Sequence, residues 1–258
     1  MTASEIAAWI GAAAWLPPIL FWIYQITVKP KIALVSGPHT QIGYALFTGP
    51  SVHLNCAISA SRRDAVIQKM LLRVQHEKGQ SASFLWTYLN ETFSQIRGVT
   101  GETAEVSKSQ PAIALKVGTL VLVEKLISFN EVEFQQRQNI LFSPIVELRN
   151  HLQKTQPESF RDLTIRSREF AALVDFYKKN VFWQQGKYTV TVCINVVGSK
   201  RPTLSTLEFS LSSTDIDRLS HNVLAIEQDL IGAISPPAGA RIPVLYDWIS
   251  VNIRSFKQ

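Results

Sequence analysis

Residues 187–212 read KYTVTVCINVVGSKRPTLSTLEFSLS, and this stretch decides the fold class. Apolar residues recur at every second position of its first half, as on one face of a strand: Tyr188, Val190, Val192, Ile194 and Val196. The two halves are joined by VGSKRP (197–202), whose glycine and proline are typical of turns. The stretch therefore predicts an antiparallel hairpin of two strands, residues 187–196 and 203–212.

The same period of two recurs through much of the chain. Further strands are predicted at residues 31–35, 52–59, 65–77, 84–89 and 112–129. Gly118 interrupts the last of them, so that stretch is either one bent strand or two. Seven or eight antiparallel strands at these spacings predict a mainly β, α+β fold built on a two-sheet sandwich.

Three segments show the period of an amphipathic helix instead. In residues 143–154, Ser143 suits the N-cap and Pro144 suits the first helical position. Residues 167–180 and 214–232 each place their apolar side chains on one stripe. We expect these stripes to pack against the sandwich.

The segment QQGKYTVTVCINVVG contains Gly-x-Tyr-x-Val-x-Val at residues 186–192. This pattern resembles a strand found near the end of immunoglobulin-like and PKD-like β-sandwich domains. In such domains a cysteine pair can bridge two strands, so the resemblance implies a candidate disulfide between Cys56 and Cys193. The alternation argues against that bond, because Cys56 lies on the apolar face of its strand and Cys193 on the opposite face of its own. We therefore expect two free thiols.

The N-terminal region is apolar. From Ile6 to Val28 there are 23 residues without a charged side chain. A helix of that length spans about 34 Å, and a bilayer's hydrocarbon core is about 30 Å thick. A cleaved signal peptide fits poorly, because the stretch has neither a basic start nor a small-residue cleavage site at its end. The sequence predicts a single transmembrane helix, with the lipid bilayer as a partner.

Two prolines and several aromatic residues mark this helix. The prolines lie at the middle of the run and predict a kink, with a re-entrant hairpin and a buried core helix as the alternatives. Tryptophan and tyrosine suit the membrane interfaces. The candidate anchor residues are Trp9, Trp15, Pro17, Pro18, Trp22, Tyr24, Lys29 and Lys31.

The basic residues beside the stretch predict its orientation. Lys29 and Lys31 follow it directly, whereas Glu5 is the only charged side chain before it. The positive-inside rule then puts the C-terminal domain in the cytoplasm. The expected organisation is an anchor at residues 1–28 and a sandwich domain at 29–258, with a helical insertion at about 143–182 and a late amphipathic helix.

The chain has 26 basic and 20 acidic residues, a formal net charge of +6. The basic residues are dispersed along the sequence, so we expect a solvated surface and no nucleic-acid partner. Under a membrane, the same charge would give a mild attraction to acidic lipid headgroups.

No catalytic constellation is visible. There is no GxSxG, HExxH, Walker A or Rossmann motif, and the five histidines are scattered. His76 and Glu77 are expected at a solvated hairpin tip, and Asp215 with Asp217 in the first turn of a helix, where acidic residues cap. We therefore expect no catalytic, cofactor-binding or metal-binding residues.

These observations favour a single-pass membrane protein that is not an enzyme. Its β-domain would bind a partner protein, or act as a sensor or scaffold at the membrane. Self-association is a further possibility, since Gly11 and the alanines after it form a small-residue face. Two alternatives stay open: an anchored enzyme whose site is assembled from loops, and an outward-facing binding module of the cell envelope.

Overall fold

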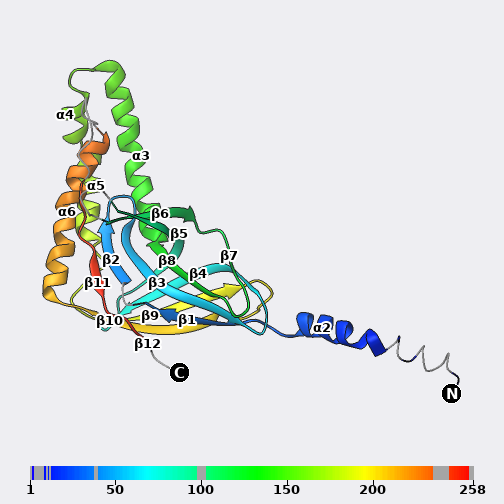
Figure 1. Ribbon diagram of the computed structural model, residues 1–258. Coiled ribbons are helices and arrows are strands. Elements are labelled where there is room, and N and C mark those ends of the chain that lie inside the picture. The colour runs from blue at the N-terminus through cyan, green and yellow to red at the C-terminus, as the bar shows by residue number, and fades with distance from the viewer. Residues whose placement is uncertain are drawn as a thin grey trace.

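The computed structural model describes residues 2, 9, 11, 13–37, 40–97, 103–234 and 244–255, without the side chains of 25, 26, 91–97, 103–107 and 255. It shows an α+β protein with one large antiparallel sheet, a group of helices on one side of it and an N-terminal helix that projects away (Figure 1). The mainly β, α+β prediction is confirmed at this level.

The described strands number twelve and form one sheet. They are β1 (Lys31–Ser36), β2 (Thr40–Ala45), β3 (Gly49–Ser61), β4 (Ala65–His76), β5 (Ser81–Arg97), β6 (Thr103–Pro111), β7 (Leu115–Val117), β8 (Leu122–Glu131), β9 (Gly186–Val196), β10 (Thr203–Leu211), β11 (Ile249–Val251) and β12 (Arg254–Ser255). Their order is β11-β2-β3-β8-β5-β4-β9-β10-β12, with β1 on β3, β6 on β5 and β7 on β4. The predicted hairpin of residues 187–212 is confirmed as β9 and β10.

The two ends of this strand order approach each other. β10 contacts β11, and β1 contacts β12, so the sheet curls into a nearly closed, barrel-like shape. The predicted division into two stacked sheets is therefore wrong, because the strands pair in one continuous series. Bulges in β4 (Ile67/Lys69) and β5 (Trp86/Tyr88) give the strands the extra bend and twist that this curling needs.

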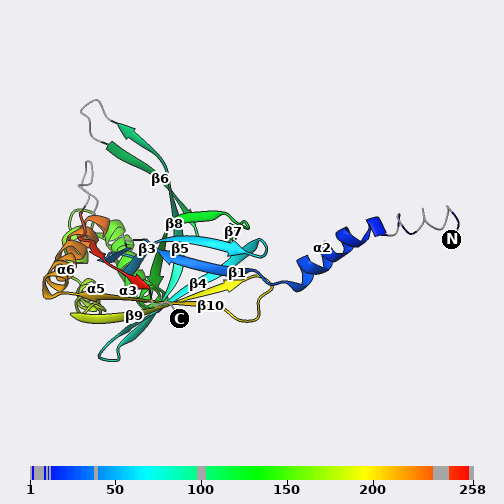
Figure 2. The same ribbon diagram turned by 60° about the horizontal axis from the view of Figure 1, so that its bottom comes forward.

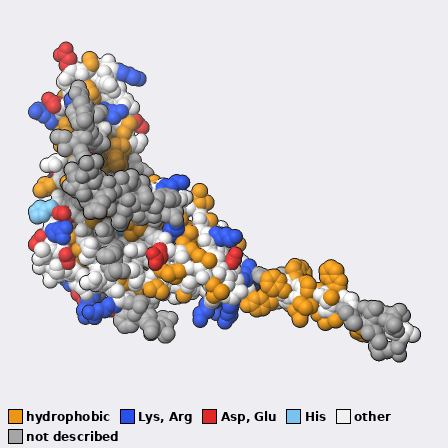
Figure 3. Space-filling view, viewed as in Figure 1, with side chains coloured by type: hydrophobic (Ala, Val, Ile, Leu, Met, Phe, Trp, Pro, Cys, Tyr) orange, Lys and Arg blue, Asp and Glu red, His pale blue; other side chains and the backbone are white. Residues whose placement is uncertain are grey.

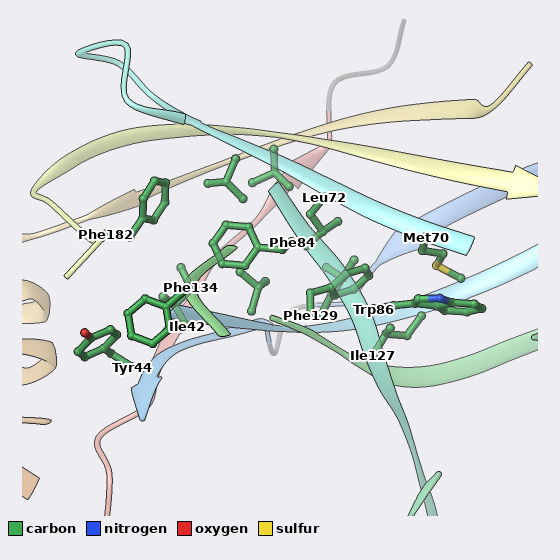
Figure 4. Close-up of a cluster of buried hydrophobic side chains, with 14 of the residues drawn as sticks. Ile42, Tyr44, Met70, Leu72, Phe84, Trp86, Ile127, Phe129, Phe134 and Phe182 are labelled. Atoms are coloured by element: carbon green, nitrogen blue, oxygen red, sulfur yellow. The ribbon is translucent and has the colours of Figure 1, made fainter. Parts of the chain in front are cut away.

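The concave face of the sheet encloses the core. In β3, Val52, Leu54, Cys56 and Ile58 are all buried, as their alternation predicts. Large side chains from β2, β4, β5 and β8 meet in the same space (Figure 4). The start of helix α3 (Val132–Thr155) adds Phe134, whose ring packs edge-on against Tyr44.

The helices between β8 and β9 are α3, α4 (Phe160–Ile165) and α5 (Arg168–Lys179). The predicted start of a helix at Ser143 is wrong, because α3 begins at Val132 and continues through Pro144. The reason lies in the packing: Phe134, Gln138 and Ile145 share one buried face, so the same face holds the helix on both sides of the proline.

The other two predicted helices are confirmed. In α5, Ser167 caps the N-terminus by accepting a hydrogen bond from the Phe170 backbone N–H, and Leu173 is fully buried. Helix α6 (Ser213–Ile234) buries a stripe that includes Leu219 and Leu230. Asp215 exchanges hydrogen bonds with Ser212 at its start, which confirms the capping role.

Candidate functional site

Helix α2 (Leu16–Thr27) carries the most unusual surface of the described chain. Its consecutive residues Leu20, Phe21, Trp22 and Ile23 are 62%, 63%, 65% and 45% exposed. Since successive residues point about 100° apart around a helix, apolar side chains face outward on every side of α2. The helix stands clear of the domain in two views (Figures 1 and 2), and its surface is almost continuously apolar (Figure 3).

The two prolines lie where a helix tolerates them. α2 begins at Leu16, so Pro17 and Pro18 fall in its first turn, where the backbone N–H groups have no intrahelical partner. Ala13 and Ala14 are also helical, and Trp15 forms a turn between them and α2. The helix interruption that was expected at Pro17 and Pro18 is therefore a turn at Trp15, two residues before Pro17.

Every predicted anchor residue lies within the described chain. The tryptophans at positions 9, 15 and 22 and Tyr24 are exposed, and Lys29 and Lys31 are exposed directly after the helix. Residues 6–8, 10 and 12 of the predicted span lie outside the described residues. Among the helices that the structure describes, none combines the length and the apolar character needed to cross a membrane.

The C-terminal end of α2 is tied to the turn between β3 and β4. Tyr24 Oη donates a hydrogen bond to the Arg62 carbonyl oxygen (3.4 Å), and Arg63 Nη1 donates one to the Val28 carbonyl oxygen (3.4 Å). Asp64 in the same turn accepts two hydrogen bonds from Thr119, at 2.8 and 3.0 Å. These contacts join α2, the β3–β4 turn and the β7–β8 loop at one end of the sheet.

Two residues at this end hold strained backbone conformations. Arg62 has φ = 75° and Leu120 has φ = 64°, in the left-handed region that non-glycine residues seldom adopt. Leu120 is 92% exposed, so the strain is not offset by burial of its side chain. Such outliers concentrate at functional positions, which directs attention to this end of the domain.

A second candidate surface is a polar groove on the outer face of β4, β5 and β9, beside the start of α3. Its volume is about 920 Å³. Leu71 and Leu85, paired across β4 and β5, contribute apolar side chains. The remaining lining residues are Lys69, Arg73, Val74, Gln75, Ser81, Ala82, Ser83, Glu131, Val132, Glu133, Gln136, Thr189 and Thr191.

The groove carries charges of both signs on different elements. Lys69 and Arg73 come from β4, whereas Glu131 and Glu133 lie at the start of α3. Partial burial raises the pKa of the Glu131 carboxyl, an effect that the Arg137 guanidinium opposes. This arrangement suits a partner that presents both acidic and basic groups.

Two titratable residues, His76 and Cys56, are buried in the domain. His76 is buried, with Nε2 3.1 Å from the Gln185 carbonyl oxygen, so the prediction of a solvated hairpin tip is wrong for this residue. Tyr188 packs on its ring and closes it off from water. Cys56 and Cys193 are free, as expected, and burial raises the pKa of the Cys56 thiol to about 12.

Within the described residues, no three His, Cys, Asp or Glu side chains are placed to hold a metal ion. No protein-family model, curated protein or solved structure matches this chain. The resemblance of residues 186–192 to immunoglobulin-like and PKD-like strands therefore stays a prediction.

Proposed function

We propose that this chain is a single-pass membrane protein that is not an enzyme and whose β-domain binds a partner protein on the cytoplasmic side. The observation that carries the proposal is the exposure of apolar side chains all around α2. Exposed apolar surface costs roughly 25 cal/mol per Å², and insertion into lipid removes that cost. Orientation rests on Lys29 and Lys31, which follow the helix.

Alkaline extraction of membranes from cells that express the full chain tests the anchor. We expect the protein to stay in the membrane fraction, and Leu20→Asp to move most of it to the supernatant, because a carboxylate near a helix centre costs about 2.5–3.5 kcal/mol. Leu224→Asp is the matched control, since Leu224 is 59% exposed on α6, away from α2. Release of the unmodified chain by alkali would refute the anchor.

Protease treatment of intact cells tests the orientation. We expect a C-terminal tag to be protected until the membrane is permeabilised. Digestion of the tag in intact cells would establish the outward-facing alternative.

The partner-binding part of the proposal is supported by the polar groove. Crosslinking in membranes followed by pull-down should recover a protein that carries acidic and basic side chains at its contact site. Arg73→Glu reverses an exposed charge in the groove and should abolish recovery. Arg166→Glu makes the same charge change at an exposed position after α4 and should not. Equal recovery by the two variants would exclude the groove.

A further inference from the structure

The net charge of the protein is concentrated at the end of the sheet that α2 joins. Seven basic residues belong to four segments there, and we call them the basic collar: Lys29, Lys31, Arg62, Arg63, Lys116, Lys200 and Arg201. The same segments (29–31, 62–64, 116–121 and 197–202) contain one acidic residue, Asp64. Subtracting these seven and one from the chain's 26 basic and 20 acidic residues leaves 19 of each sign. The rest of the chain is therefore neutral overall.

Backbone pairing brings the four segments together. Lys31 at the start of β1 lies opposite Ser61 at the end of β3, directly before the β3–β4 turn. The start of β4 pairs with β7, which brings Lys116 opposite Val66. The Val197 N–H donates a hydrogen bond to the Val66 carbonyl oxygen (2.9 Å), which places the β9–β10 turn beside them. Figure 3 shows basic side chains near the point where the apolar helix joins the domain.

Exposed apolar side chains accompany this charge. In the β7–β8 loop, Leu120 and Val121 are 92% and 51% exposed, and Leu122 at the start of β8 is 59% exposed. In the β9–β10 turn, Val197 is 53% exposed. The Leu120 N–H donates to the Ala60 carbonyl oxygen (3.2 Å), so the strained loop is fixed to the end of β3. Adjacent basic and apolar side chains are the combination that binds the interface of an anionic bilayer.

An open hollow of about 410 Å³ lies between α2 and the collar. Phe21 and Tyr24 line it from the helix, and Arg62, Arg63, Asp64 and Thr119 line it from the domain. The hollow therefore lies where an inserted α2 would leave the membrane, at the depth of the lipid headgroups.

We propose that the basic collar binds the anionic headgroups of the bilayer in which α2 is inserted, with Leu120–Leu122 entering the interfacial layer. This inference rests on the proposed membrane anchor. The occupant follows from charge complementarity and from the continuity of the collar with the apolar helix. The cytoplasmic leaflet, where the orientation puts the domain, is the one rich in anionic lipid.

Hydrogen exchange of the full chain in lipid nanodiscs tests the collar. One set of discs contains phosphatidylcholine alone, and the other contains in addition about one third phosphatidylserine. We expect exchange in the β3–β4 turn, the β7–β8 loop and the β9–β10 turn to slow at least fivefold with phosphatidylserine, and the effect to fade in high salt. Equal exchange in the two kinds of disc would overturn the proposal.

Matched charge reversals show whether the collar itself causes the slower exchange in discs with phosphatidylserine. Lys200→Glu with Arg201→Glu should abolish the slowing. Lys78→Glu with Lys187→Glu makes the same charge change at the opposite end of these strands, since Lys78 follows the end of β4 and Lys187 lies at the start of β9, and this variant should retain the slowing. Loss of the slowing in both double variants would also overturn the proposal, because the lipid effect would then follow net charge alone.

A variant of Leu120 tests the apolar contact without loss of folding. Asparagine tolerates positive φ, so Leu120→Asn should keep the thermal midpoint while exchange in the β7–β8 loop becomes faster in the discs that contain phosphatidylserine. No change in exchange would exclude insertion of the loop. Failure of the anchor has a different signature, since the chain would then not incorporate into discs of either composition.

Discussion

Gly43 in β2 is a position at which three distant parts of the chain meet. Its carbonyl oxygen accepts a hydrogen bond from Trp183 Nε1 (2.9 Å), and the ring of Trp248 lies against its Cα. A Cβ at this position would overlap the Trp248 ring, so the absence of a side chain is a packing requirement.

Gly43→Ala should lower the free energy of unfolding by about 1–3 kcal/mol, because Trp248 must move to make room. Urea denaturation of the purified chain measures this. Gly11→Ala is the control and should change the free energy little, since Gly11 has open space around it. Equal stability of the Gly43 variant would mean that Trp248 repacks freely.

His53 is stacked on the same indole. The ring centroids of His53 and Trp248 are 4.2 Å apart and nearly parallel. Burial lowers the pKa of His53 from 6.5 to about 4, since the charged form would lose its hydration. The folded protein therefore favours the neutral imidazole.

A lowered histidine pKa gives a defined pH dependence. The contribution of His53 to stability is complete above pH 6.5 and is lost as the pH falls towards 4, because only the unfolded chain binds the proton in that range. Between pH 7 and pH 4.5 we expect a loss of about 2–3 kcal/mol from this group. His53→Phe keeps the stacking and should reduce the loss by that amount in urea titrations at the two pH values. An identical loss in the variant would assign the effect to other groups.

At the scale of elements, the sequence predicts those that have one apolar face. The strands β3, β4, β9 and β10 and the helices α5 and α6 were predictable on this basis. β2 was not, because it is buried on nearly every residue beneath α6 and shows no alternation. The described side chains of β6, residues 108–111, are exposed and polar or proline, so no apolar period marks that strand.

Pro144 illustrates a conflict between local preference and packing. A proline in a helix interior removes one hydrogen bond and crowds the preceding turn, at a cost of about 3 kcal/mol. In α3 that cost is offset by the packing of a buried face that extends from Phe134 to Ile145. Local sequence could not reveal this, since the partners of that face lie in other elements.

Pro144→Ala should stabilise the chain by about 1–3 kcal/mol, because it restores the missing hydrogen bond at an exposed position. Thermal unfolding followed by circular dichroism measures the shift. Glu147→Ala, an exposed substitution in the same helix, serves as the control and should have little effect. A lower midpoint for the Pro144 variant would show that the proline stabilises α3.

At the scale of the whole molecule, the sheet is completed by residues far apart in the chain. Asn222 of α6 is buried and holds the backbone of Asp247 with two hydrogen bonds of 2.8 Å, one donated and one accepted. Tyr246 Oη donates another to Asp229 (2.6 Å). These contacts position the C-terminal segment so that β11 and β12 pair with β2 and β10.

Asn222→Ala removes both hydrogen bonds and leaves two backbone groups of Asp247 without these partners. We expect the free energy of unfolding to fall by about 1–3 kcal/mol and hydrogen exchange to increase in β11 and β2. Asn222→Asp keeps the side-chain acceptor, so its free energy of unfolding should lie between those of the unmodified chain and of Asn222→Ala. Unchanged exchange in β11 would mean that the strand pairing alone holds the segment.

The candidate sites also emerge only at this scale. The proposed anchor is one continuous stretch of the sequence, whereas the cations of the basic collar come from four separate segments and look dispersed in the sequence. The residues that line the groove likewise come from separate segments of the chain. Alternation predicts which residues of β9 face outward, but not that β4 lies beside β9 and β5 beside β4, with Arg73 opposite both Thr191 and Ser83.

The short junction between α2 and β1 has a consequence for how a partner is met. Val28, Lys29 and Pro30 separate the two elements, a reach of about 10 Å even when fully extended. In the proposed membrane-anchored arrangement, a domain tethered so closely would explore a thin layer above the lipid rather than a volume of cytosol. Encounter with a second membrane-bound protein then becomes a search in two dimensions, in which a weak groove suffices.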